Sequence, residues 1–157
     1  MTLWTKTFRI EQEQFIPKAR TEVFKFFSDA FNLQALTPSF LNFMILTKPP
    51  IDIQEGTLID YRIALFGIPM EWKTRIERFE VDTMFVDQQI QGPYQLWHHT
   101  HTFEDVPGGT MMRDIVDYRL PFGPIGLIAH AIFVRRTLQR IFKYRYDSLD
   151  RLLGEIS

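Results

Sequence analysis

Residues 94–120 read YQLWHHTHTFEDVPGGTMMRDIVDYRL, two strand-like runs separated by the turn-forming sequence VPGG at 106–109. Three of the four histidines of the chain lie in the first run. Because side chains alternate between the two faces of a strand, one face of this run combines imidazoles with large aromatic rings. These residues are Trp97, His99, His101 and Phe103. Such interleaving is typical of the wall of an apolar pocket.

The register of this hairpin follows from a turn that pairs Asp105 with Thr110. In that register His101 faces Asp114, and on the opposite face His98 lies next to Asp117. Three further cross-strand pairs are predicted: His99 with Val116, Trp97 with Tyr118, and Phe103 with Met112. A different turn length would slide all of these pairs, and a slip of one residue would exchange the two faces.

The predicted pair of His101 and Asp114 has two interpretations. A buried histidine next to an aspartate is most often a hydrogen-bonded core pair, whereas in a pocket the same groups can transfer a proton. For His98 and Asp117 we expect a surface pair. Two histidines two residues apart on one face could also bind zinc, but no third or fourth ligand is evident and cysteine is absent. We therefore expect no metal ion and no other cofactor.

The composition indicates a single globular domain over residues 1–157, with a formal charge of −1 that gives no general attraction to nucleic acid. The 15 Phe, 5 Tyr and 3 Trp are more rings than a core of this size needs, and a fold wrapped around a cavity could use them as lining. Residues 1–10 become charged before a long apolar run develops, so we expect no signal peptide and a cytoplasmic protein.

The remaining periodicities predict a strand, two short helices, six strands and a long C-terminal helix. The strands lie at 8–16, 41–46, 58–65, 70–79 and 84–90 besides the hairpin already described, and the short helices at 19–27 and 31–36. The long helix ends near residue 153 with an apolar stripe of Leu127, Ala131, Val134, Leu138, Ile141, Phe142, Leu149 and Leu152. This is an α+β pattern, in which the inner face of an antiparallel sheet and the helix stripe cover each other.

Two details of the middle strands follow from the same alternation. A loop of four residues at 66–69 places Ile59 opposite Ile76, Tyr61 opposite Thr74, Ile63 opposite Trp72 and Leu65 opposite Met70. Asp60 and Arg75 then meet on the outer face. In the strand at 84–90 either Met84, Val86 and Ile90 are buried, or Phe85, Asp87 and Gln89 point toward polar groups in a pocket.

The chain resembles the START-like (SRPBCC) superfamily, which includes the birch pollen allergen fold, lipid-transfer START domains and polyketide cyclase/dehydrase-like proteins. The resemblance covers essentially the whole chain and is closest to a bacterial ligand-binding branch. It rests on FIPKARTEVF at 15–24, LTP at 36–38, GPY at 92–94 and the alternating residues at 97–103 and 114–123. It implies a helix-grip fold, in which a curved seven-stranded antiparallel sheet wraps a long C-terminal helix around a hydrophobic cavity. The same fold serves carriers, receptors and enzymes.

Alternate loops of an antiparallel meander emerge at the same end of the sheet, so the loops at 66–69, 91–94 and 121–126 should cluster. They carry the apolar residues Phe66, Ile68, Tyr94, Phe122 and Ile125, which we call the cavity rim. The rim is either the mouth of the cavity, in transient contact with a membrane or a partner, or ordinary packing against the start of the helix. The basic residues of the long helix, Arg135, Arg136, Arg140, Lys143, Arg145 and Arg151, form either a solvated face or a weak attraction to anionic lipid.

Three functions are compatible with these patterns. The first is a non-catalytic carrier or sensor of a hydrophobic ligand such as a lipid, a polyketide or an aromatic metabolite. Its apolar walls would be Tyr61, Trp72, Trp97, Phe103 and Tyr118, with His99, His101 and Asp114 orienting a polar group. The second is a cyclase/dehydratase-like enzyme in which Asp114 orients His101 for acid–base chemistry. The third is a protein-interaction module that uses the cavity rim.

Overall fold

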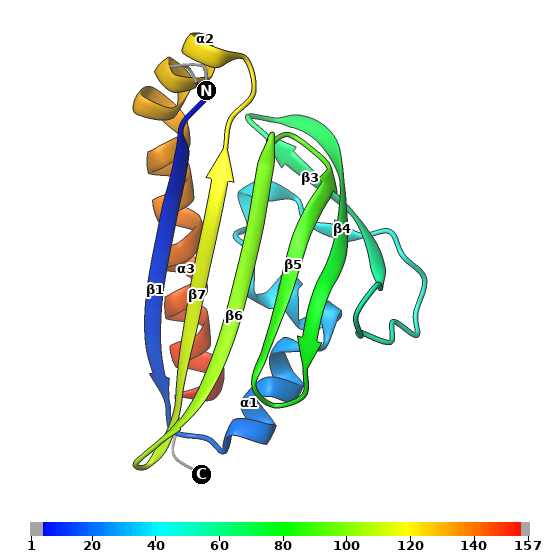
Figure 1. Ribbon diagram of the computed structural model, residues 1–157, viewed down its shortest axis with the longest axis vertical. Helices are drawn as coiled ribbons and strands as arrows, with labels where there is room; N and C mark the ends of the chain where they lie inside the picture. The colour runs from blue at the N-terminus through cyan, green and yellow to red at the C-terminus, as the bar shows by residue number, and fades with distance from the viewer. Residues whose placement is uncertain (1–4, 155–157) are drawn as a thin grey trace.

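The structure is a computed structural model that describes residues 5–154. The expectation of no signal peptide concerns residues 1–10, of which the first four lie outside the described residues. Seven strands form one curved antiparallel sheet (Figure 1), in the order β1-β7-β6-β5-β4-β3-β2. The strands are β1 (Thr7–Ile16), β2 (Met44–Ile45), β3 (Leu58–Leu65), β4 (Ile68–Glu80), β5 (Met84–Gln91), β6 (Leu96–Val106) and β7 (Gly109–Arg119).

The helices lie in two groups. The segment between β1 and β2 contains α1 (Arg20–Phe27) and two short 3-10 helices, η1 (Ala30–Leu36) and η2 (Ser39–Leu41). The C-terminal helix has three continuous parts: α2 (Gly123–Ala129), a π-helical turn η3 (His130–Val134) and α3 (Arg135–Leu153). Figure 1 shows α3 running alongside β1 and β7 over much of the length of the sheet. The predicted helix-grip architecture is confirmed.

One strand and the apolar stripe of the long helix differ from the prediction. The strand expected at 41–46 is reduced to Met44–Ile45, because residues 39–41 form η2 and Asn42 then adopts a left-handed conformation with φ of 45°. In the C-terminal helix, Ala131 and Leu152 are exposed, whereas Leu153 is buried. The buried apolar residues of α3 are at positions 138, 142, 149 and 153, and this line of residues faces the sheet.

The register of the β6–β7 hairpin is confirmed. Asp105 pairs with Thr110 and His101 with Asp114, and the pairs of His99, Trp97 and Phe103 are also as predicted. Val106 pairs with Gly109, so the turn itself contains two residues, Pro107 and Gly108. Gly108 has a φ of 85°, a conformation that costs a glycine little. The imidazoles of His99 and His101 therefore lie on the inner face of the sheet.

The predicted register of the β3–β4 hairpin is wrong by two residues. Its turn is Phe66-Gly67, so Leu65 pairs with Ile68, and Tyr61 lies opposite Trp72. Both turn residues have positive φ, 51° and 77°, as two-residue hairpin turns of the primed type require. Because the slip is even, each side chain keeps its predicted face.

The slip also changes the outer ion pairs of this hairpin. Asp60 lies opposite Lys73, with 3.7 Å between Lys73 Nζ and Asp60 Oδ1. Arg75, which was predicted to meet Asp60, donates instead to Glu77 two residues along the same strand.

The hydrophobic core lies between the inner face of the sheet and the helices. At one end Val23 and Phe24 of α1 pack against Phe103, Met112 and Leu149. At the other end Trp97, Val116 and Tyr118 pack against Leu138 and Phe142 of α3. A third cluster joins Ala30 of η1 to Ile59 and Tyr61 of β3, and residues of all three clusters line a cavity.

Candidate functional site

A cavity of about 190 Å³ lies between the sheet, η1 and α3. Its walls come from β3, β4, β5 and β6, from η1 and from one face of α3. Most of the lining side chains are apolar, including Ala30, Leu36, Ile59, Ile63, Leu138 and Phe142. The strand alternation that buries these residues also directs a small number of polar side chains into the same space.

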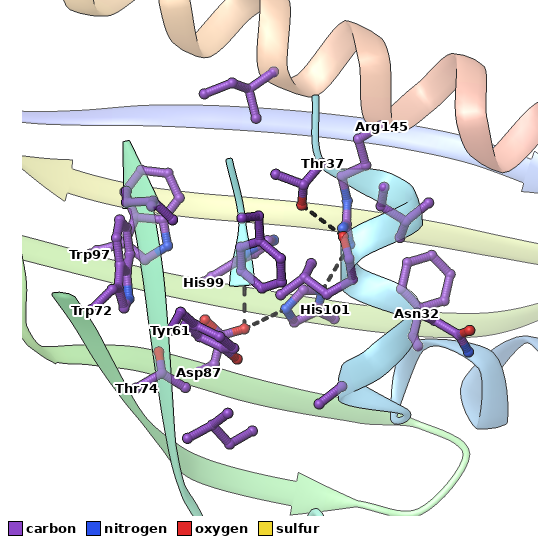
Figure 2. A pocket seen from close by; sticks show the side chains of 18 of the residues that line it. Asn32, Thr37, Tyr61, Trp72, Thr74, Asp87, Trp97, His99, His101 and Arg145 are labelled. Carbon is purple, nitrogen blue, oxygen red and sulfur yellow. Dashed lines mark hydrogen bonds and ion pairs between the residues drawn. The ribbon is translucent and has the colours of Figure 1, made fainter. Parts of the chain in front are cut away.

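Aromatic rings form one side of the cavity. The rings of Trp72 and Trp97 meet edge to face with their centroids 5.4 Å apart, and Tyr94 lies 4.8 Å from Trp97. Tyr61 lines the cavity from β3, opposite Trp72 of β4. Figure 2 shows Tyr61, Trp72 and Trp97 grouped on the side of the cavity away from Arg145. These rings provide a rigid apolar surface against which a planar molecule can stack.

The two inward histidines lie between two carboxylates. His99 Nε2 and His101 Nδ1 lie 2.8 Å and 3.1 Å from Asp114 Oδ1. Their other ring nitrogens face Asp87 Oδ2, at 2.7 Å from His101 Nε2 and 3.9 Å from His99 Nδ1. Figure 2 shows Asp87, His99 and His101 pointing toward one another. Asp87 thus belongs to the site. For this residue the second interpretation of the 84–90 strand holds, in which the side chain points toward polar groups in a pocket.

Arg145 of α3 reaches into the sheet and pairs with Asp114. Arg145 Nε donates to Asp114 Oδ2 at 2.8 Å, and a terminal guanidinium nitrogen donates to Asp114 Oδ1 at 3.1 Å. Both residues are buried, with Asp114 only 1% exposed. The expectation that Arg145 belongs to a solvated or lipid-facing helix surface is therefore wrong. A bidentate pair of this kind fixes both the position and the orientation of the carboxylate.

Burial disfavours the charged form of every titratable group in this cluster, and the neighbouring groups determine which of them are charged. Burial raises the pKa of Asp114, but Arg145 and hydrogen bonds from His101 and His99 outweigh it and hold that pKa well below its usual range. Burial likewise raises the pKa of Asp87, but the hydrogen bond from His101 and the charges of His99, His101 and Arg145 together outweigh it and lower that pKa. Burial lowers the pKa of His101, but its hydrogen bonds to Asp114 and Asp87 and the negative charges of both carboxylates together outweigh burial and raise it. Burial and the neighbouring His101 lower the pKa of His99.

The predicted wall and orienting residues occupy different positions relative to the cavity. Those that line it are Tyr61, Trp72, Trp97, His99 and His101. Phe103 lies in the adjoining core, where it meets Phe24 edge to face at 5.3 Å. Asp114 lies behind the histidines. Tyr118 faces another hollow between β1 and the C-terminal helix, with its hydroxyl oxygen 2.7 Å from His130 Nε2.

Arg145 is the site residue for which the sequence analysis predicted the wrong environment. It occupies the same helix face as Leu138, Phe142 and Leu149. A single charge within an apolar stripe could have been detected from this spacing alone. The identity of its partner could not, because Asp114 lies 31 positions away on another element.

The residues of the cavity rim lie at one end of the sheet. Figure 1 shows α2, the β3–β4 turn and the β5–β6 loop at this end. Phe66, Phe122 and Ile125 are 70%, 79% and 72% exposed, and Ile68 is also exposed. Tyr94 differs from the others because it lines the cavity. On the outer face of the sheet, Asp117 lies opposite His98. Its Oδ1 accepts a hydrogen bond from Arg9 Nε at 2.7 Å, so Arg9 is its close partner.

The comparisons with known proteins agree with this architecture. The family model for "Polyketide cyclase / dehydrase and lipid transport" matches residues 16–142, and the chain belongs to this family. A search of curated protein sequences finds no match. Across the described residues, 5–154, no helix is long and apolar enough to cross a membrane.

Solved structures support the same fold. A protein of unknown function, SA2116 from Staphylococcus aureus, is 11% identical over 98% of this chain and 97% of that chain, with a TM-score of 0.72. Protein CV1439 from Chromobacterium violaceum is 14% identical over 94% and 98%, with a TM-score of 0.70. Ara h 8.0201 is 17% identical over 90% and 97%, with a TM-score of 0.59. At these identities the likeness establishes the fold alone, and the family match confirms the resemblance predicted from the sequence.

Proposed function

We propose that the protein binds a small apolar molecule with one hydrogen-bonding or anionic group, and acts as its carrier or sensor. The observation that carries this proposal is a cavity whose walls are mostly apolar and aromatic, with one charged cluster and a few separate polar side chains: Asp29, Asn32, Thr37 and Thr74. Ligand sites commonly have this composition, since the apolar walls supply affinity and a few polar groups fix the orientation. Membership of a family described by polyketide cyclisation and lipid transport supports the same conclusion.

The volume of the cavity limits the size of the ligand. A cavity of about 150 Å³ can hold benzene, whereas pockets for drug-sized ligands usually span about 300–1,000 Å³. At about 190 Å³ the cavity suits a one-ring or compact two-ring molecule. A ligand with long acyl chains would require the walls to move apart.

The test uses 2-naphthoate, a two-ring aromatic carboxylate, and follows the fluorescence of Trp72 and Trp97 in the cavity wall. The variant Ala30→Phe fills the cavity from η1, and Ala35→Phe adds the same ring at an exposed position of the same helix. We expect saturable quenching that Ala30→Phe weakens at least tenfold and Ala35→Phe leaves unchanged. Circular dichroism checks that both variants fold. Absence of saturable quenching in the natural sequence, or equal effects of the two variants, would contradict the proposal.

A second candidate function is acid–base catalysis in the same cavity. The observation that favours it is the position of His101, whose two ring nitrogens face carboxylates at the cavity wall. A compound extracted from protein purified from its own cells and identified by native mass spectrometry provides the substrate. An enzyme that depends on this residue should lose about 10²-fold or more of its turnover in His101→Ala. A carrier should form no product and should change only its affinity.

We also propose that the cavity rim contacts an anionic bilayer during ligand exchange. Phe66 and Phe122 both hold positive φ, 51° and 70°, although a bulky side chain disfavours this conformation, and both are largely exposed. Strained, exposed apolar residues are typical of functional sites rather than of cores. Arg135 and Arg136 are exposed immediately after the apolar residues of η3 and provide charge complementary to anionic headgroups.

Sedimentation with vesicles tests this contact. We expect binding to vesicles of phosphatidylcholine with phosphatidylserine that weakens as salt is added, because screening reduces attraction to the headgroups. Phe122→Ser should reduce binding severalfold. Val81→Ser is the control, since Val81 is 69% exposed in the β4–β5 turn at the opposite end of the sheet. Equal losses in the two variants would exclude the cavity rim as the contact.

A further inference from the structure

Asp87, His99 and His101 form a potential set of metal ligands at the cavity wall. One donor atom from each residue lies within 4.8 Å of the other two. Adjacent strands supply the set, because β5 places Asp87 directly opposite His99 and the alternation of β6 puts His101 on the same face. The sequence analysis expected no metal because a third ligand was not evident, and Asp87 is that third candidate.

The surroundings of the two histidines match a second feature of metal sites. A metal-binding histidine usually donates its remaining ring N–H to a carboxylate, which fixes the ring and the tautomer. Here the nitrogen of each ring that faces away from Asp87 lies against Asp114 Oδ1, at 2.8 Å for His99 and 3.1 Å for His101. Two hydrogen bonds from Arg145 hold this carboxylate in turn. In the neutral tautomers that donate these N–H groups to Asp114, the ring nitrogens that face Asp87 have lone pairs available to a cation, and an ion bound there would replace the hydrogen bond between His101 Nε2 and Asp87.

All three candidate ligands also line the cavity. A metal ion bound by them would have three protein ligands and at least one position open to the cavity, which is the coordination typical of zinc sites that bind a substrate or water. Imidazole nitrogen and carboxylate oxygen together suit divalent first-row transition metals better than calcium or magnesium. Tetrahedral coordination with bonds of about 2.0 Å separates neighbouring ligand atoms by about 3.3 Å. The 2.7 Å contact of His101 and Asp87 must therefore widen slightly, and the 3.9 Å contact of His99 must shorten.

We propose that Asp87, His99 and His101 bind one divalent first-row transition metal ion such as Zn²⁺, with the open position facing the cavity. With neutral imidazoles, the carboxylates of Asp87 and Asp114, the guanidinium of Arg145 and a divalent ion leave one positive charge. An anionic oxygen of a molecule in the cavity would neutralise that charge. Metal uptake is measured without any organic ligand, so this proposal and the proposed ligand-binding function can fail separately.

The test is calorimetric titration of Zn²⁺ into the full chain after treatment with EDTA and dialysis. We expect one ion per chain, with binding lost in Asp87→Asn, His99→Gln and His101→Gln. His98→Gln is the matched control, because His98 lies next to His99 on the opposite face of β6 and should leave affinity unchanged. Titration with Co²⁺ should give the visible absorption of a site with nitrogen and oxygen ligands in the natural sequence and in His98→Gln alone.

Circular dichroism and thermal unfolding of every variant separate loss of a ligand from loss of the fold. In the natural sequence, bound Zn²⁺ should also raise the unfolding temperature, because the ion binds the folded state. Three results would overturn the proposal: no uptake by the folded natural protein, undiminished uptake by the folded Asp87→Asn and His99→Gln variants, or equal loss in His98→Gln. The last two results would place any bound metal elsewhere on the chain.

Discussion

Arg145 Nε lies 2.8 Å from Asp114 Oδ2, and this buried contact joins α3 to β7 across the interior of the protein. Asp114 lies behind the histidines of the cavity, whereas Arg145 is itself one of the lining residues. The pair therefore links the position of the long helix to the geometry of the candidate site. A charge pair in this setting also makes the stability of the fold sensitive to either partner.

The first prediction concerns that sensitivity. Arg145→Met should lower the free energy of unfolding by about 3–5 kcal/mol, because it leaves the buried carboxylate of Asp114 without its guanidinium partner. Urea unfolding followed by circular dichroism measures the change. Lys143→Met on the same helix is the control, since Lys143 pairs with Asp147 at an exposed position and should have little effect. Similar losses in the two variants would contradict a special role for the buried pair.

The second prediction tests the face that α3 presents to the core. Leu149 is 0% exposed and Leu152 is 44% exposed, although both were expected in the apolar stripe. Leu149→Ala should lower the free energy of unfolding by about 2–5 kcal/mol, the usual range for a buried leucine. Leu152→Ala should cost much less in the same urea titration. A reversed order would mean that the helix is rotated relative to the sheet.

The third prediction concerns alkaline pH. Burial raises the pKa of Tyr94 above its ordinary value of 10.0, with a smaller contribution from Tyr118. The folded state thus retains a proton that the unfolded state releases, and the stabilisation is complete below about pH 10 and lost as the pH rises above it. The free energy of unfolding should fall more steeply above pH 10 in the natural sequence than in Tyr94→Phe. Tyr144→Phe, at an exposed position, should retain the steep fall.

The fourth prediction tests the strain in the β3–β4 turn. Phe66 has a φ of 51°, which asparagine tolerates better than a bulky ring does. Phe66→Asn should therefore raise the free energy of unfolding by about 1 kcal/mol. The same variant should bind anionic vesicles less well if the cavity rim contacts membranes. Loss of stability in Phe66→Asn would show that the ring contributes packing, such as its contact with Phe133 at 5.9 Å, that outweighs the strain.

The resemblance to START-like proteins indicated the fold family. The sequence by itself also determined the order of the elements and the β6–β7 register. These follow from local signals: alternation along each strand, a Pro-Gly turn, and the periodicity of the last helix. The register of the β3–β4 hairpin escaped prediction because a phenylalanine occupies a left-handed turn position that usually favours Asn, Asp or Gly.

Only the tertiary structure decided which charged groups meet at the cavity. Asp87, His99 and Asp114 come from three neighbouring strands, and Arg145 comes from a helix on the inner side of the sheet. The β6–β7 register predicted that His101 faces Asp114, but no local pattern identified Arg145 as the further partner of Asp114. The partner depends on the curvature of the sheet and on the position of α3 against it, both of which result from packing between residues far apart in the chain.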